Sequence, residues 1–160
     1  MCIIELAPAA GERGWQTGAV VSPERADEVR QVVDTVHRWA VGRADVRGVL
    51  VVGSWARDAA RMDSDVDIVV LSDAHPDAHA EPATWTRLLG GDVVREQDWG
   101  PLREIRVRRP SGFEVEIGVV PVGWAATDPV DPGTYRVISD GHRVVYDPAG
   151  ILAALSRACR

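Results

Sequence analysis

Two short apolar runs, joined by a polar connection, constrain the fold of this chain most strongly. The runs are Val46–Val52 and Val66–Leu71, and both have the length and β-branched content of strands buried on both faces. Between them we expect a short helix over Ser54–Ala60. Asp65 and Asp67 lie at the entrance to the second run. So much negative charge beside a core requires a chemical reason.

The rest of the sequence supplies further helices and strands around this pair. Ser22, as an N-cap followed by Pro23, begins a helix that Gly42 ends. The remaining patterns predict helices over Pro82–Leu89 and Pro148–Ala158, strands over Asp92–Glu96, Leu102–Arg108, Phe113–Val120 and Arg143–Tyr146, and either structure over Thr134–Ser139. The expected fold class is therefore α/β (α+β), with a mixed twisted sheet flanked by helices.

Length, charge and cysteine content limit the classes of function. With 160 residues and 46% hydrophobic content, we expect a loose N-terminal extension over residues 1–21 and one domain over residues 22–160. A net charge of −6 argues against nucleic acid as the main partner. Only Cys2 and Cys159 are present, and no apolar run could cross a membrane, so we expect two free thiols in the cytoplasm.

The paired aspartates predict a metal site. Residues two apart on a strand point to the same side, so Asp65 and Asp67 present both carboxylates to one place. Two such charges resist joint ionisation unless a cation lies between them. Oxygen ligands favour a hard ion, Mg²⁺ or Mn²⁺, which also takes ligands from substrate phosphates.

The preceding turn offers a place for those phosphates. Gly53 allows the backbone to approach a ligand closely, and Ser54 opens a helix whose N–H groups favour an anion. Gly53-Ser54, ten residues, then Asp65-Val66-Asp67 resembles the signature of the DNA polymerase beta superfamily of nucleotidyltransferases. The stretch is most similar to the minimal nucleotidyltransferases and the small antibiotic adenylyltransferases.

This resemblance implies a third carboxylate on a later strand. Glu116, followed by an apolar run that ends at Pro121, resembles the family's acidic strand and is our choice for catalysis and metal binding beside Asp65 and Asp67. Glu114 shares its face, so spacing alone does not separate the two glutamates.

The resemblance also places nucleotide-binding groups at Gly53, Ser54 and Arg57. One departure from the pattern is Asp58, an acid where the family has a glycine near the triphosphate. It could weaken nucleotide binding, or it could turn outward and pair with Arg61.

The reaction that the resemblance implies is transfer of a nucleoside monophosphate, with ATP as the expected donor, to a hydroxyl of a small molecule such as an antibiotic. Two alternatives remain open: an antitoxin-type enzyme that binds or nucleotidylates a toxin protein, and an inactive nucleotide-binding module. The short tail after Pro121 leaves little room for the helical acceptor domain of larger relatives, so a homodimer is one way to complete an acceptor cleft.

Other polar and aromatic residues have simpler interpretations. We expect surface or packing roles, rather than phosphate, base or metal binding, for Arg103, Arg106, Arg108, Arg109, Trp55, Trp99, Trp124 and the alternating His75, Asp77, His79 and Glu81.

Overall fold

A computed structural model describes residues 20–160 of the chain. The loose extension expected over residues 1–21 therefore falls almost entirely outside the described residues, and so does Cys2. Cys159 is a buried free thiol at the end of the last helix.

The core of the fold is a six-stranded mixed sheet. Its order is β3-β4-β5-β2-β1-β6. The central pair, β2 with β5, is parallel, and the other four pairings are antiparallel. The strands are β1 Val46–Val52, β2 Val66–Ser72, β3 Asp92–Trp99, β4 Leu102–Arg108, β5 Glu114–Pro121 and β6 His142–Tyr146.

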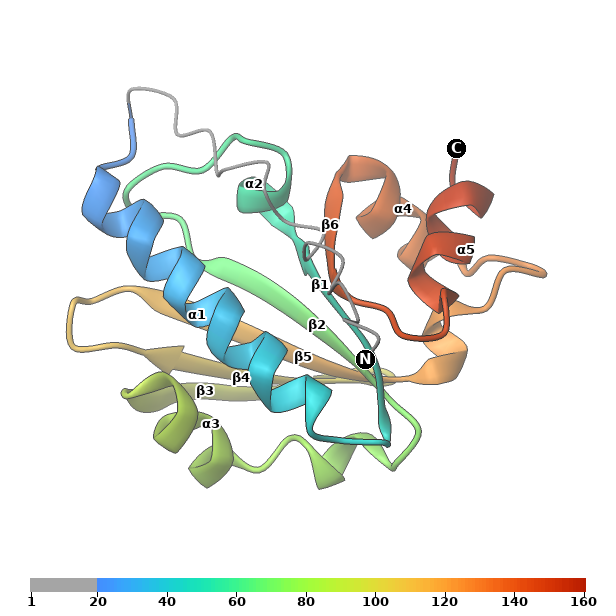
Figure 1. The fold of residues 1–160 in the computed structure, drawn as a ribbon, viewed down its shortest axis with the longest axis horizontal. Helices are drawn as coiled ribbons and strands as arrows, with labels where there is room; N and C mark the ends of the chain where they lie inside the picture. The colour runs from blue at the N-terminus through green and yellow to red at the C-terminus, as the bar shows by residue number, and fades with distance from the viewer. Residues whose placement is uncertain (1–19) are drawn as a thin grey trace, which may run out of the picture.

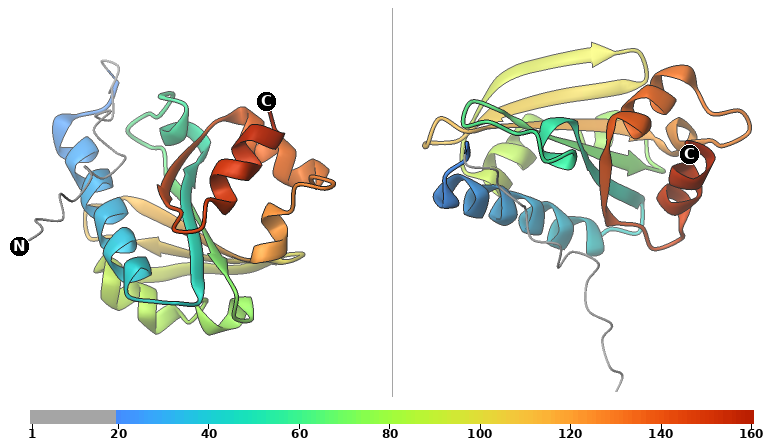
Figure 2. Two further views of the ribbon diagram at one scale, coloured as in Figure 1. Left: turned by 45° about the vertical axis from the view of Figure 1, so that its right-hand side comes forward. Right: turned by 90° about the horizontal axis from the view of Figure 1, so that it is seen from above.

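Helices lie on both sides of the sheet (Figures 1 and 2). The long α1 crosses one face with α3 beside it, whereas α4 and α5 lie together near β6. The helices are α1 Pro23–Val41, α2 Gly53–Ala56, α3 Pro82–Leu89, α4 Pro132–Asp140 and α5 Ile151–Ala158, with 3₁₀ turns at Pro76–Ala78 and Val122–Ala125. The expected mixed sheet flanked by helices is confirmed.

Local sequence signals explain most of the boundaries. The Ser22 hydroxyl accepts a hydrogen bond from the Arg25 N–H at the start of α1, as the N-cap pattern predicts. Asp131 caps α4 in the same way, through the N–H groups of Gly133 and Thr134. This cap, followed by Pro132, makes the ambiguous segment a helix.

Three element lengths differ from the prediction. The helix α2 is a single turn of four residues rather than a segment reaching Ala60, because Asp58 takes the left-handed conformation with φ 56°. Strand β3 continues to Trp99, because β4 pairs with it to that point. Helix α5 begins at Ile151, since the Asp147 carboxylate accepts from the N–H groups of its first turn.

The two faces of the sheet differ in chemistry. On the face under α1 and α3, alternate residues of β2, β4 and β5 form one continuous apolar core. The opposite face carries a second apolar cluster under α4 and α5, built around Leu50, Leu71 and Leu155. At the other end of that second face the strands carry carboxylates and guanidinium groups instead. Within residues 20–160, no helix is both long and apolar enough to cross a membrane.

Candidate active site

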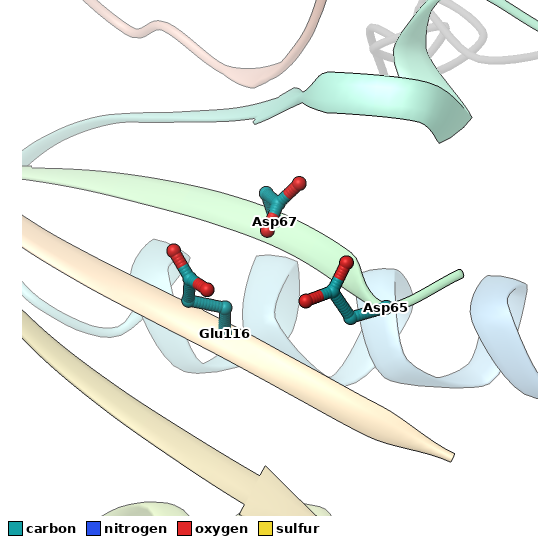
Figure 3. Close-up of side chains that lie close together, drawn as sticks. All are labelled: Asp65, Asp67 and Glu116. Atoms are coloured by element: carbon teal, nitrogen blue, oxygen red, sulfur yellow. The ribbon is translucent and has the colours of Figure 1, made fainter. Parts of the chain in front are cut away.

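Three carboxylates meet on the charged end of the second face. Asp65 immediately precedes β2, Asp67 lies on β2, and Glu116 lies opposite Asp67 on the parallel strand β5. One oxygen from each lies within 4.8 Å of the others, and all three side chains are partly buried. Figure 3 shows them converging from these two elements. In the part of the chain that the structure describes, no other acidic, histidine or cysteine group has the closeness of a metal site.

Glu114 does not join this cluster. Its carboxylate is bound instead by Arg108, at 2.7 Å, and by Arg106, at 3.1 Å. The hydrogen bonds from Arg108 and then from Arg106 outweigh the effect of burial and hold the pKa of Glu114 below its ordinary value. The structure therefore separates two glutamates that strand alternation alone leaves equivalent.

Gly53 lies directly against the carboxylate of Asp67. Its φ of +71° is in the left-handed region, where glycine is favoured over residues with a Cβ. A Cβ at this position would come closer to Oδ2 of Asp67 than side chains in proteins approach one another, and it would lie 3.3 Å from Cγ. The glycine thus leaves space for a carboxylate of the chain itself, in addition to any ligand.

The other two predicted nucleotide-binding residues lie next to Gly53. Ser54 is half-buried in α2, and Arg57 is exposed at its C-terminal end. Within residues 20–160, neither side chain makes a hydrogen bond or an ion pair, so both remain available to an incoming anion. Because α2 is one turn long, its dipole contributes less than the longer expected helix would.

Asp58 is tied to the last strand of the sheet. Its carboxylate lies 2.5 Å from Nη2 of Arg143, whose Nε also donates to the carbonyl of Ala56. The alternative pairing with Arg61 is not formed, because Arg61 approaches Asp63 instead, at 3.7 Å. The negative charge that departs from the family pattern is therefore compensated within the chain.

Arg106 supplies the positive charge beside the three carboxylates. Its Nη2 lies 3.1 Å from Asp65 and makes a very short contact with Glu116, while Nη1 lies 3.1 Å from Glu114. Burial alone would lower the pKa of Arg106, but hydrogen bonds with Glu116 and then Glu114 raise it above its ordinary value. This guanidinium is fully charged at every physiological pH.

One compensating cation is not enough for the whole cluster. Burial, and then the charges of Asp65 and Glu116, raise the pKa of Asp67 from 3.8 to about 7. Burial and the charge of Glu104 raise the pKa of Glu116, although Arg106 opposes the shift. At neutral pH the negative charge of the site therefore favours binding of a further cation. The oxygen-only ligands, their closeness and this negative charge fit a hard divalent cation.

The remaining residues considered in the sequence have structural roles. Trp55 is buried, Trp124 packs against the second apolar cluster and Trp99 is 52% exposed. Of the alternating loop residues, His75 contacts Asp77, whereas His79 lies 2.7 Å from Asp45, outside the set. They do not gather into one site.

The match to a protein-family model agrees with this geometry. A family model described as "Nucleotidyltransferase domain" matches residues 29–123, more than half of the chain. The chain belongs to this nucleotidyltransferase family. The matched segment contains both aspartates, Glu116 and the Gly53-Ser54 turn. No curated protein sequence matches the chain.

Several solved structures resemble this chain, each with a TM-score below 0.5. Cid1 poly(U) polymerase bound to MgATP is 22% identical, with a TM-score of 0.47 over 62% of this chain and 33% of that chain. A second Cid1 structure, with Mg 3'-dATP, has the same identity and TM-score. A cytoplasmic RNA terminal U-transferase is 21% identical over 62% of this chain and 30% of that chain, with a TM-score of 0.47. The chain therefore spans about a third of the length of these proteins.

Sequence reasoning missed the role of β4 in the candidate site. Glu104 is a charged residue that is only 3% exposed, and it accepts hydrogen bonds from Arg95 and Trp99 at 2.6 Å. Arg106 lies two residues further along the strand, opposite Glu116. The signal was present: Arg106 and Arg108 alternate on one arm of the predicted hairpin and Glu114 and Glu116 on the other, so opposite charges pair across it.

Proposed function

We propose that this nucleotidyltransferase moves a nucleoside monophosphate, AMP, from ATP to a hydroxyl of a small-molecule acceptor and releases pyrophosphate. The observation that carries the proposal is the convergence of Asp65, Asp67 and Glu116 beside the Gly53-Ser54 turn. The contact between Gly53 and Asp67 joins the phosphate-binding turn to the carboxylate cluster. Donor phosphates on the turn would lie next to the acidic groups.

In this proposal Asp65, Asp67 and Glu116 hold Mg²⁺ or Mn²⁺. When bound, the metal neutralises phosphate charge and lowers the pKa of the acceptor hydroxyl. Ser54 and Arg57 bind the phosphates, since both are without intramolecular partners in the described part of the chain. Glu116 accepts the hydroxyl proton, a role that suits a carboxylate whose pKa is raised by burial.

The acceptor class rests on charge. With a net charge of −6 and an acidic site, the domain offers little to the backbone of a nucleic acid. A neutral or cationic hydroxyl compound, such as an aminoglycoside-like antibiotic, is compatible with this field. A toxin protein is the alternative acceptor, and no contact of the described residues favours it.

The test is a transfer assay with a defined matrix of substrates. The purified protein is incubated with Mg²⁺ and each α-labelled nucleoside triphosphate against hydroxyl compounds, an RNA oligonucleotide and lysate proteins. We expect label from ATP on a small molecule, with none when Asp65 and Asp67 are both changed to Asn. Label on a protein band supports the toxin alternative, and label on RNA refutes the acceptor class. Absence of both transfer and metal-dependent triphosphate binding refutes the proposal that the protein is an enzyme.

A further inference from the structure

Arg106 occupies the position of a counter-cation inside the carboxylate cluster. Its two terminal nitrogens divide their contacts: Nη2 binds Asp65 and Glu116, whereas Nη1 binds Glu114 outside the cluster. Only 20% of the side chain is exposed. Two of the three carboxylates proposed as metal ligands, Asp65 and Glu116, are thus already engaged by a cation of the chain itself.

The fit of this guanidinium is incomplete. Its Nε is buried and has no hydrogen-bond partner among the described residues, and it lies 3.9 Å from Oε1 of Glu104. A buried donor without a partner costs free energy. Asp67 makes no ion pair with any described residue, so the guanidinium compensates only two of the three carboxylates. The resting arrangement therefore stabilises the site only in part.

A divalent cation and the guanidinium compete for the same two carboxylates, those of Asp65 and Glu116. Asp65 and Glu116 must turn oxygens toward the ion, and the Nη2 contacts must then break or lengthen. The Nη1 contact with Glu114 involves no proposed ligand and can persist. Glu114 is held in place by two hydrogen bonds from Arg108, so it provides a fixed anchor for the released side chain.

We infer that Arg106 is a built-in competitor of the metal: it holds Asp65 and Glu116 in the metal-free site and is released from them when a divalent ion binds. This inference rests on the proposed metal site. The released guanidinium stays beside the site, anchored at Glu114, where it can bind the negatively charged phosphates of the donor. Arg106 is thus a positioning residue that sets the threshold for metal binding.

The test measures binding of Mn²⁺ alone, by calorimetry and by electron paramagnetic resonance, without nucleotide. In Arg106→Gln no ion pair has to be broken, so we expect at least roughly tenfold tighter Mn²⁺ binding than in the wild type. Arg108→Gln is the matched control: it removes a neighbouring arginine of the same strand that contacts Glu114 but not Asp65 or Glu116. Its Mn²⁺ affinity should remain that of the wild type.

A measurement on the wild type keeps the test independent of mutant folding. In protein labelled with ¹⁵N at arginine, the Nε–H signal of Arg106, assigned with Arg106→Lys, should shift and exchange faster with water on addition of Mg²⁺. Wild-type Mn²⁺ binding with equal or weaker binding in Arg106→Gln, or an Arg106 signal unmoved by saturating Mg²⁺, overturns the inference and leaves the proposed function standing. No Mn²⁺ binding by either protein overturns both.

Discussion

Replacing Gly53 by Ala should disturb the carboxylate cluster more than it destabilises the fold. Gly53 has φ +71°, and forcing alanine into the left-handed region costs about 1 to 2 kcal/mol. The added methyl would also clash with Oδ2 of Asp67, the flexible end of that side chain. The carboxylate can rotate away at little cost in stability, but it then leaves its place beside Asp65 and Glu116.

Gly90 offers a control for the backbone cost. It has φ +70° at the end of α3, and a Cβ there would meet no atom within 4 Å. Gly53→Ala and Gly90→Ala should therefore lose similar stability, about 1 to 2 kcal/mol each, in chemical denaturation. Only Gly53→Ala moves a carboxylate, and a displacement on the order of 1 Å in an active site costs about 100-fold in rate.

The assay compares three proteins at equal folded fraction: the wild type, Gly53→Ala and Gly90→Ala. Denaturation gives the stability loss, and Mn²⁺ calorimetry with labelled-nucleotide transfer gives the function. We expect the two variants to match in stability and to differ in metal affinity and turnover. Equal metal affinity and turnover in both variants would refute the reasoning, because the contact with Asp67 would then have no consequence.

Three further predictions follow from the charges of the site. In the presence of a chelator, the stability of the fold should fall as pH rises from about 4 to about 7, because folded Asp67, with its pKa raised from 3.8 to about 7, binds a proton that the unfolded chain has lost. Thermal unfolding at pH 5 and pH 8 measures this, and Asp67→Asn should lack this component of the pH dependence. A pH dependence parallel to that of the wild type would contradict the assignment. Glu116→Gln should abolish transfer while donor binding survives, whereas Glu114→Gln should retain most transfer, and the reverse result in turnover assays would place the third carboxylate at Glu114. Asp58→Asn should change triphosphate affinity by no more than about fivefold, since Arg143 already compensates the charge in an ion pair of ordinary surface strength. A larger increase in triphosphate affinity, measured by calorimetry, would show that Asp58 repels the donor.

Sequence periodicity predicted the sheet well because its strands have simple environments. The β1 and β2 runs are apolar on both sides, since helices cover both faces there, and the turn before β5 carries its own Pro and Gly signals. The length of α2 was wrong because a single backbone conformation, that of Asp58, ends it. Asp adopts that conformation more often than most residues, but only in a small minority of cases, and the ion pair with Arg143 lies 85 residues away in the sequence.

The candidate site shows the same division between local and long-range information. Strand alternation placed Asp65 and Asp67 together, but it left Glu114 and Glu116 equivalent. What separates the glutamates is the register of β5 against β2, which sets Glu116 opposite Asp67, and the arginines of β4 that engage Glu114. Pairing register and ion-pair partners depend on the assembled sheet, so a linear pattern does not contain them.

The parallel pairing of β2 with β5 has a consequence for how the chain acquires its site. Asp67 and Glu116 are 49 positions apart, and α3 and the β3–β4 hairpin form between them. A parallel pair needs such a crossover, and non-local pairings are the slow steps of folding. During synthesis, a chain that ends before β5 already displays both aspartates but has no third carboxylate. Completion of the cluster thus requires β2 and β5 to pair, and a ligand that requires all three carboxylates distinguishes chains that have formed this central pair from chains that have not.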